Sequence, residues 1–450
     1  MPARQIDMTE GSIFSKLMKF SIPLILSNLL QLMFNAADVI VVGRFAGDNS
    51  LAAVGSTGSL INLLVNLFTG LSIGTNVVAA HFFGAKKSLE LKNTVHTAIL
   101  LSVISGIILT LVGVIFTKPI LRLMQAPEAV LNLAALYLKV YFGGITATMV
   151  YNFGSALLRA KGDTERPLII LFIAGILNVL LNLFFVIKCS MDVAGVALAT
   201  IISQTLSAVL VIIILVRETD DFKLNLKNLK LNFPILAKIV KIGLPAGFQG
   251  IVFSFSNVII QSSINSFGSI AIAGNSAASN IEGFVYTSMN GFSQGALTFC
   301  SQNMGAGKKD RIKKLVFISQ AVIIVIGEGL GFLVYIFGET LLGFYTKNPE
   351  VIQHGMIRIG IICTTYALCG MMDCMANTIR GIGHSLIPMI VTLVGACGLR
   401  LLYLATLFQI PFFHTERMIF LSYPVSWLVT HLILIVCFIL ILKKNKNTDI

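Results

Sequence analysis

Long apolar runs separated by short polar segments cover most of the 450-residue chain. Twelve of these runs are each long enough to cross about 30 Å of hydrocarbon as a helix. The pattern therefore predicts an all-α integral membrane protein with twelve transmembrane helices. The predicted spans are 17–43, 50–83, 94–117, 131–158, 167–187, 193–216, 238–266, 272–303, 314–337, 351–379, 385–408 and 415–442.

The second predicted span has a counterpart in the eighth. Gly70–Lys87 (GLSIGTNVVAAHFFGAKK) resembles Gly291–Lys308 (GFSQGALTFCSQNMGAGK), and Ala37–Gly55 resembles Ser256–Gly274. Six spans in each half make both halves enter the membrane from the same side, as parallel repeats with a substrate path between them. We therefore predict an N-lobe at 1–216, a cytoplasmic linker at 217–236 and a C-lobe at 237–450.

Composition supports the membrane assignment. The chain is 56% hydrophobic and 12% charged, whereas about a quarter of the residues of soluble domains are charged. The formal net charge of +13 comes from Lys and Arg that gather in the tails and in the loops after even-numbered spans. This asymmetry predicts that both termini are cytoplasmic. The basic balance thus reflects topology and excludes a nucleic-acid partner.

The first predicted span carries an unusual set of polar side chains. Gln31, Asn35 and Asp38 follow i, i+4, i+7 spacing and share one helical face. Such residues are costly in lipid, so this face must point to a cavity or a neighbouring helix. We expect a hydrated site in the outer half of the N-lobe. The alternative is that Asp38 only pairs with an adjacent helix.

Several motifs, taken in order and in both halves, indicate a family. They are Leu51-Ala-Ala-Val-Gly55, Gly243-Leu-Pro245, Gln302-Asn-Met-Gly-Ala-Gly-Lys308 and the twin Arg-x-x-Gly loops at Arg159 and Arg380. The chain resembles the multidrug and toxic compound extrusion (MATE) transporters over nearly its whole length. The resemblance implies a V of two six-helix lobes that alternate between inward-open and outward-open states.

The resemblance also implies a function. Amphipathic, often cationic organic compounds would be exported in exchange for H⁺ or Na⁺, with no other cofactor. The setting would be the lipid bilayer of a prokaryotic cytoplasmic membrane, with the protein acting as a monomer. Which of the two ions is coupled stays open at this stage.

In the DinF-like branch of this family, the N-lobe site has an Asp on span 1, an Asn-x-x-x-Asp pair on span 5 and a Thr on span 6. The matching positions here are Asp38, Asn178 with Asn182, and Thr200. The second carboxylate of the pair is therefore an amide, which puts a two-carboxylate proton mechanism in doubt. The NorM-like carboxylate positions hold Phe253 and Cys369, so the site is closer to the DinF-like pattern.

A mechanism follows from these positions. A proton arriving from outside would neutralise Asp38 and weaken its attraction for a bound cation. Asn178, Asn182 and Thr200 can hydrogen-bond either form of the acid, or ligate Na⁺ together with Asp38.

The C-lobe offers three further charged candidates. Glu282 and Arg400 lie at similar predicted depths, which suggests an intramembrane ion pair with a structural role ahead of a coupling role. Asp373 either faces the cleft or caps the Arg380 loop.

Two other classes of function compete. A flippase for lipid-linked oligosaccharides needs several cationic residues in its cleft to neutralise a pyrophosphate, and Arg400 is the one basic residue that we place mid-membrane. An enzyme is disfavoured because no nucleophile–base pair, phosphate loop or metal cluster is evident.

Overall fold

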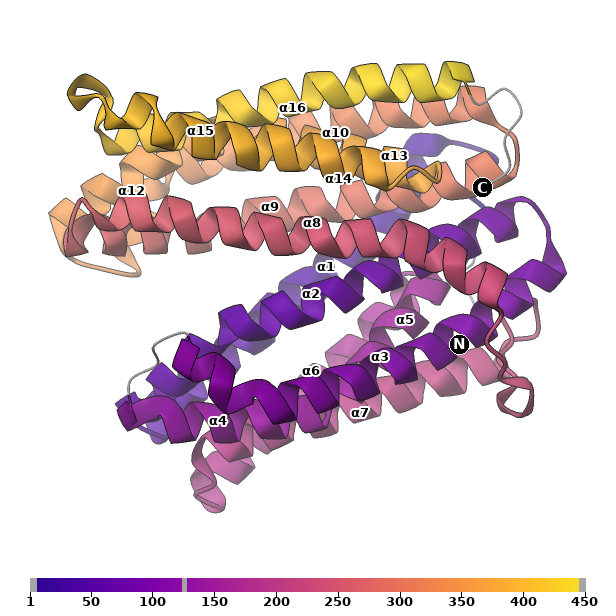
Figure 1. The fold of residues 1–450 in the computed structure, drawn as a ribbon, viewed down its shortest axis with the longest axis horizontal. Coiled ribbons are helices and arrows are strands. Elements are labelled where there is room, and N and C mark those ends of the chain that lie inside the picture. Colours follow the sequence, from indigo (N-terminus) through magenta and orange to yellow (C-terminus); the bar gives the residue numbers. More distant parts are fainter. Residues whose placement is uncertain (1–5, 124–127, 445–450) are drawn as a thin grey trace. The chain divides into compact units, whose positions relative to one another are not determined.

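A computed structural model describes residues 6–123 and 128–444. Over these residues the chain is helical and has no β-strand (Figure 1). The chain ends, which the charge pattern predicts to be cytoplasmic, lie partly outside the described residues. The first half contains α1 (Ile13–Phe45), α2 (Asp48–Gly84), α3 (Ser88–Leu123), α4 (Glu128–Gly143), α5 (Ile145–Lys161), α6 (Glu165–Leu183) with a π-helical extension η1 (Phe184–Lys188), and α7 (Asp192–Arg217).

The second half repeats the pattern after a short 3₁₀ turn, η2 (Leu226–Asn228). Its elements are α8 (Phe233–Asn265), α9 (Ser269–Gly305), α10 (Lys309–Ile336), α11 (Gly338–Gly343), α12 (Pro349–Ile362), η3 (Cys363–Thr365), α13 (Tyr366–Gly381), α14 (Leu386–Thr392), η4 (Leu393–Gly398), α15 (Leu399–Ala405), η5 (Leu407–Gln409), η6 (Pro411–Phe413) and α16 (Glu416–Lys444).

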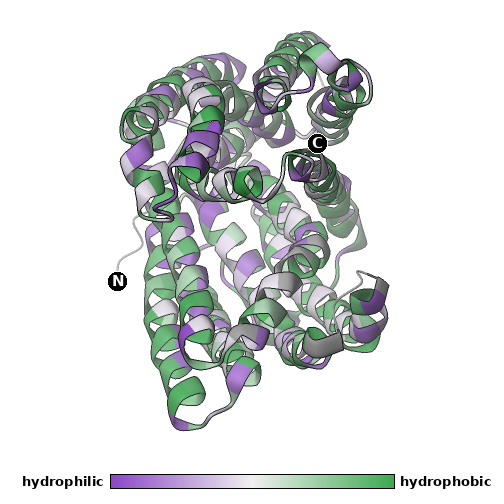
Figure 2. Ribbon diagram, turned by 90° about the vertical axis from the view of Figure 1, so that its left-hand side faces the viewer, coloured by the Kyte–Doolittle hydropathy of each residue, from purple (hydrophilic) through white to green (hydrophobic). Residues whose placement is uncertain are grey.

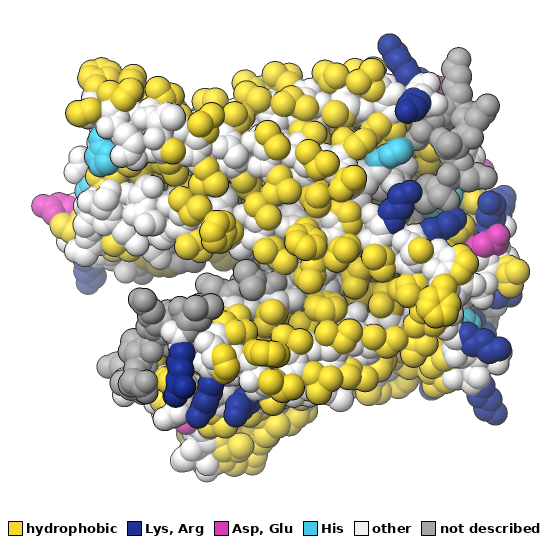
Figure 3. Space-filling view, viewed as in Figure 1, with side chains coloured by type: hydrophobic (Ala, Val, Ile, Leu, Met, Phe, Trp, Pro, Cys, Tyr) yellow, Lys and Arg dark blue, Asp and Glu magenta, His cyan; other side chains and the backbone are white. Residues whose placement is uncertain are grey.

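These helices confirm the predicted all-α membrane architecture. Ten of the spans in the described residues are long and apolar enough to cross a membrane, and α4 with α5, bent by 48°, make an eleventh. The remaining predicted span, 272–303, lies in α9, which has the length of 37 residues but a more polar composition. Figure 2 shows hydrophobic residues predominating along the helices. On the face drawn in Figure 3, Lys and Arg gather near helix ends while hydrophobic side chains cover the middle.

Contacts divide the chain into two compact units that each contain part of α1 and part of α8. Unit 1 contains Leu26–Gly247, and unit 2 contains Met8–Ile25 together with the chain from Phe248 onward. The boundary between the units falls after Ile25 in α1 and after Gly247 in α8. Each boundary lies two residues after a proline of the same helix, Pro23 or Pro245. Proline removes a backbone hydrogen bond and thereby weakens a helix at that point. The predicted division into lobes at residues 217–236 stays a prediction.

In unit 1 the first half of α8 packs directly on α2. Gly70 and Gly74 of α2 face Gly243 and Gly247 of α8, and a Cβ built on Gly74 would lie 2.3 Å from the carbonyl oxygen of Ile239. Small residues at four-residue spacing allow two helix backbones to approach this closely.

Unit 2 uses the repeated glycines in the same way. Gly291 and Gly295 of α9 receive the first half of α1, where a Cβ on Gly295 would lie 2.7 Å from the Ser21 hydroxyl. Phe20 packs edge-on against Phe299 with ring centroids 5.9 Å apart. The glycines shared by the two related stretches therefore each receive the first half of another helix.

The Gln302–Lys308 motif holds the segment that precedes α1. The Met8 amide donates to Gln302 Oε1 (3.3 Å), and Asn303 Nδ2 donates to the Met8 carbonyl (3.1 Å). Lys308 Nζ donates to the carbonyl of Thr9 (3.0 Å). The polar side chains of this motif thus bind the backbone of residues 8 and 9 within unit 2.

The linker before α8 is anchored in a comparable manner on unit 1. Asp221 accepts a hydrogen bond from Ser88 and forms an ion pair with Lys92 (3.4 Å). The buried ring of Phe222 packs against Phe83, with centroids 5.5 Å apart. The linker therefore packs against the end of α2 and the start of α3.

The twin Arg-x-x-Gly loops are helix C-caps of one type. Gly162 and Gly383 have φ values of 94° and 95°, which glycine adopts without steric cost. Each glycine N–H donates to the carbonyl of the arginine three residues earlier, Arg159 or Arg380 (2.9 and 2.8 Å). The motif repeats because the same left-handed cap ends α5 and α13.

The α2–α8 contact predicts a sharp difference between two glycines of the same helix. We expect Gly74→Ala to lower the melting temperature, because its Cβ has no room and overpacking costs about 1–3 kcal/mol. Gly58→Ala is the matched control, since nothing lies within 4 Å of a Cβ there. Thermal unfolding of both variants in detergent checks this. Equal melting temperatures would show that the two backbones are not in contact.

Candidate functional site

Four of the predicted site residues lie together within unit 1. Asp38 comes from α1, Asn178 and Asn182 from α6, and Thr200 from α7. Asn182 Nδ2 donates to Asp38 Oδ1 and also to Asn178 Oδ1 (3.2 Å). Asn178 Nδ2 in turn donates to the Thr200 hydroxyl (3.4 Å). A chain of polar groups therefore connects the carboxylate to α7.

Local helix geometry explains this arrangement. The two asparagines are one turn apart on α6, so both amides project from the same face. The ring of Phe34 occupies the space that a Cβ on Gly175 would need, and this brings α1 against α6 one turn before the cluster. Asn182 and Asn178 are buried while Asp38 is half-buried. The carboxylate thus stands at the accessible edge of a buried amide pair.

The next feature of the cluster is the lack of a described cation beside the carboxylate. Among the described residues, no Lys, Arg or His nitrogen lies within 4.0 Å of Asp38. The buried Asn182 Oδ1 also lacks a hydrogen-bond partner. The cluster therefore presents oxygen atoms and one acidic group that no described cation neutralises. Groups of three His, Cys, Asp or Glu with metal-binding geometry do not occur in the described part of the chain.

Two tyrosines of α4 belong to the surroundings of Asp38, and sequence reasoning did not single them out. Tyr137 and Tyr141 stack with ring centroids 6.2 Å apart, and both lie within electrostatic range of the carboxylate. Their i, i+4 spacing inside an apolar span is the signal that could have found them.

The other two polar residues of the first span are not part of the cluster. The side chains of Gln31 and Asn35 are exposed on the unit that contains them. In the described residues no hydrogen bond joins either of them to Asp38. Of the three residues predicted to share a face, Asp38 is therefore the one that joins the hydrogen-bonded cluster.

The expected ion pair between Glu282 and Arg400 in unit 2 is not formed. Glu282 on α9 instead accepts two hydrogen bonds from Arg358 on α12, one of them from Nε at 3.0 Å. Arg358 Nη1 also donates to Asn275 Oδ1 (2.5 Å). The correction has a simple cause: α12 packs directly on α9, so Arg358 reaches Glu282 from the adjacent helix. Sequence reasoning missed Arg358, although a basic residue within the predicted span 351–379 was the available signal.

Arg400 on α15 has no acidic partner among the described residues. Its guanidinium lies over the rings of Tyr423 and Trp427, with centroid distances of 4.2 and 5.4 Å, and Nε donates to the Ser426 hydroxyl (2.7 Å). The side chain is 2% exposed, Nη2 has no hydrogen-bond partner, and no described carboxylate lies within 4.0 Å. Aromatic faces offset part of the cost of burying this charge.

Asp373 on α13 accepts a hydrogen bond from the Tyr286 hydroxyl of α9 (3.0 Å). Arg380 bonds to Asn377 (2.6 Å) and Gln249 instead. Asp373 is therefore not the cap of the Arg380 loop, which was one of the two alternatives.

Comparison with known proteins decides the family. The MatE family model matches residues 23–184 and 245–406, one match in each half, as the repeat predicts. The chain belongs to the MATE family. It is therefore a multi-pass membrane transporter rather than an enzyme.

Relatives of this MATE transporter cover it almost end to end. The probable multidrug resistance protein YoeA of Bacillus subtilis is 27% identical over 87% of this chain and 86% of its own. The FAD transporter of Shewanella oneidensis is 24% identical over 86% of both chains. A solved MATE transporter, described as outward-facing, superposes with a TM-score of 0.90 at 20% identity over the full length of both chains, which establishes the fold.

The Glu282–Arg358 pair leads to a stability prediction. Arg358→Gln leaves a buried carboxylate without its cation, so we expect the free energy of unfolding to fall by about 3–5 kcal/mol. The double variant Glu282→Gln/Arg358→Gln should recover much of that loss, because no buried charge remains. Lys313→Gln, which breaks an exposed ion pair with Asp310, is the control. Thermal unfolding would contradict the assignment if the double variant were no more stable than Arg358→Gln.

Proposed function

We propose that this MATE transporter is an antiporter that exports amphipathic, often cationic compounds in exchange for H⁺ or Na⁺. Asp38 is the coupling acid in this proposal. The observation that supports it most is a single carboxylate, held by Asn182 and without a cationic partner in the described residues. The multidrug resistance relatives support the same class of cargo.

An unbalanced carboxylate is suited to exchange because its charge can be neutralised in more than one way. A proton, a Na⁺ ion or the cationic group of a substrate each compensates it, and binding of one weakens the attraction for another. Competition for one charge is the thermodynamic basis of antiport. Alternating access then lets the proton or Na⁺ enter from one side and the substrate leave on that side.

The ligand set accommodates either coupling ion. For a proton, Asn182 can hold both forms of the acid, since an amide both donates and accepts. For Na⁺, oxygen atoms are available from Asp38, from the unpartnered Asn182 Oδ1 and from Thr200. Hard cations prefer such oxygen ligands. Because residue 182 is an asparagine, Asp38 is the one carboxylate of this four-residue cluster. In the proposal it alone binds the coupling ion in each transport cycle.

The proposal extends to the setting of the protein. The charge asymmetry supports a prokaryotic cytoplasmic membrane with both termini in the cytoplasm. A monomer as the working form is part of the same proposal. The substrate path between the repeats remains part of the proposal.

The decisive experiment follows ethidium efflux from liposomes that contain the purified protein. A pH gradient and a Na⁺ gradient are imposed separately. We expect one gradient to drive efflux in the wild type, and Asp38→Asn to abolish that response while its melting temperature stays near the wild-type value. Asp310→Asn is the matched control, because Asp310 is an exposed surface acid.

Two outcomes would contradict the proposal in different ways. Gradient-driven efflux by Asp38→Asn at the wild-type rate would remove Asp38 as the coupling acid. Absence of ethidium transport by intact wild-type protein under both gradients would favour a flippase of anionic lipid-linked cargo instead.

One observation favours a second class of cargo. Arg400 is a buried cation without a carboxylate partner in the described part of the chain, and one relative is a transporter of FAD, an anionic compound. Unit 2 would then bind an anionic group through the Arg400 guanidinium, which suits phosphate and carboxylate oxygens.

Cargo competition tests this second candidate. With FAD as cargo in the same liposomes, we expect Arg400→Gln to lose FAD transport and keep ethidium transport. Arg417→Gln, an exposed arginine of the same unit, is the control. Failure of the wild type to move FAD, or equal loss of both cargoes in Arg400→Gln, would reject an anion-specific role.

A further inference from the structure

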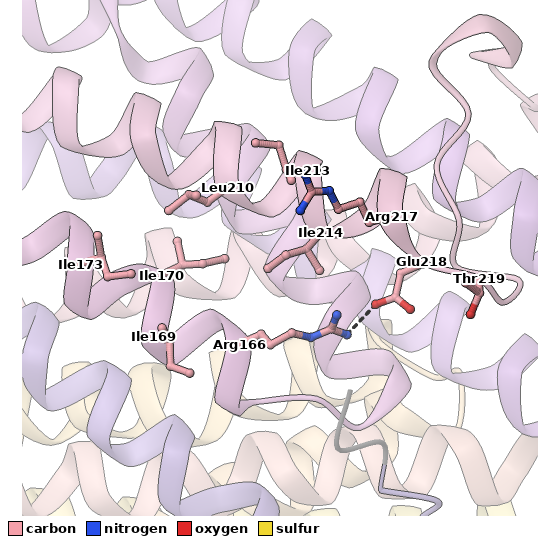
Figure 4. A pocket seen from close by; sticks show the side chains of 10 residues that line it. All are labelled: Arg166, Ile169, Ile170, Ile173, Leu210, Ile213, Ile214, Arg217, Glu218 and Thr219. Atoms are coloured by element: carbon pink, nitrogen blue, oxygen red, sulfur yellow. Dashed lines mark ion pairs between the residues drawn. The ribbon is translucent and has the colours of Figure 1, made fainter. Parts of the chain in front are cut away.

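A pocket of about 430 Å³ opens between α6 and α7 of unit 1, away from the Asp38 cluster (Figure 4). It lies at the end where α6 begins and α7 ends. Its lining residues are Arg166, Ile169, Ile170, Ile173, Leu210, Ile213, Ile214, Arg217, Glu218 and Thr219.

The pocket is polar at one end and apolar along its length. Arg166 and Arg217 lie at the ends of two adjacent spans, Glu165–Lys188 and Asp192–Arg217, and therefore at one level of the membrane. The Ile and Leu side chains follow one and two turns deeper on both helices. Seven residues separate Arg166 from Ile173, which corresponds to about 10 Å along the helix axis. The apolar part thus extends from the membrane boundary into the hydrocarbon region.

The two arginines differ in how they are bound. Arg166 is 14% exposed and already pairs with Asp163 and, at 2.6 Å, with Glu218. Arg217 is exposed and forms no ion pair with any described residue. In Figure 4 its guanidinium lies beside Ile213, over the apolar wall, while Arg166 points toward Glu218. Because Asp163 and Glu218 both pair with Arg166, Arg217 is the lining cation that has no ion-pair partner among the described residues.

We propose that this pocket binds an anionic phospholipid. The phosphate would accept hydrogen bonds from Arg217 and from the Thr219 hydroxyl, with Arg166 beside it. One acyl chain would lie along Ile169, Ile173 and Ile213, whose side chains are 36–46% exposed. The proposal does not depend on which cargo or ion the transporter uses.

Charge and position together select this occupant. A groove at this level of a membrane protein is adjacent to lipid phosphates at its polar end and to acyl chains along its apolar part. Arginine binds phosphate oxygens through its planar fork of N–H donors. A lipid that carries its own cation, such as phosphatidylcholine, brings a positive charge close to the Arg217 guanidinium, which has no ion pair with a described residue. A cationic organic compound is disfavoured for the same reason. The charge pattern places this end of the helices at the anionic cytoplasmic leaflet.

Native mass spectrometry of the full-length protein tests the proposal. The protein is equilibrated with equal amounts of phosphatidylglycerol and phosphatidylcholine of the same acyl composition. We expect the wild type to retain mainly phosphatidylglycerol, and Arg217→Gln to bind it about fivefold more weakly, the effect of one basic residue near an anionic lipid. Arg217→Lys should keep most of the binding, and Arg417→Gln, an exposed arginine that does not line the pocket, should keep all of it.

A second variant tests the apolar part without a change in charge. Ile173→Trp fills the groove from an exposed position, so we expect reduced phosphatidylglycerol binding at an unchanged melting temperature. Phosphatidylglycerol should also raise the melting temperature of the wild type more than that of Arg217→Gln. Equal retention of the two lipids by the wild type, or identical behaviour of Arg217→Gln and Arg417→Gln, would overturn the proposal.

Discussion

Polar side chains inside a membrane need partners within the protein, and this constraint determines where the charged side chains of this transporter lie and what they contact. Three arrangements meet it differently. Glu282 and Arg358 neutralise each other and leave no charge available. Arg400 relies on aromatic faces and keeps its charge. Asp38 relies on amides and has no cation within 4.0 Å among the described residues. In our proposals the last two are the groups that respond to an ion or a charged ligand, and the type of partner distinguishes them from the structural pair.

The parts of the structure that could be predicted from the sequence are those with local signals. Apolar runs predict helices wherever they occur, because every backbone group must be satisfied within the helix. The gathering of Asp38, Asn178, Asn182 and Thr200 was predicted from the family resemblance, although side-chain spacing alone relates only the two asparagines. The partner of Glu282 was not predictable. The position of a residue along its span indicates its depth in the membrane, but it does not indicate which helix packs beside it.

The repeated glycines show a related limit. Their recurrence in Gly70–Lys87 and Gly291–Lys308 marks a duplication, but the sequence does not say what packs against them. In the structure, α2 receives the first half of α8, and α9 receives the first half of α1. Each half of the chain thus supplies a helix segment to the unit built mainly from the other half. An exchange of this kind depends on contacts between residues more than 150 positions apart, which no window of sequence can contain.

The exchange has a consequence for biosynthesis. A ribosome has to extend the chain to Gly247 before unit 1 has all its helices, because the segment that closes it against α2 belongs to α8. Residues Met8–Ile25 are synthesised well before α9, which holds their partners. The start of α1 therefore stays without its final neighbours until α9 has been synthesised. The first half of the chain, taken alone, would lack the α8 segment that completes unit 1 and would carry an α1 segment that belongs to unit 2.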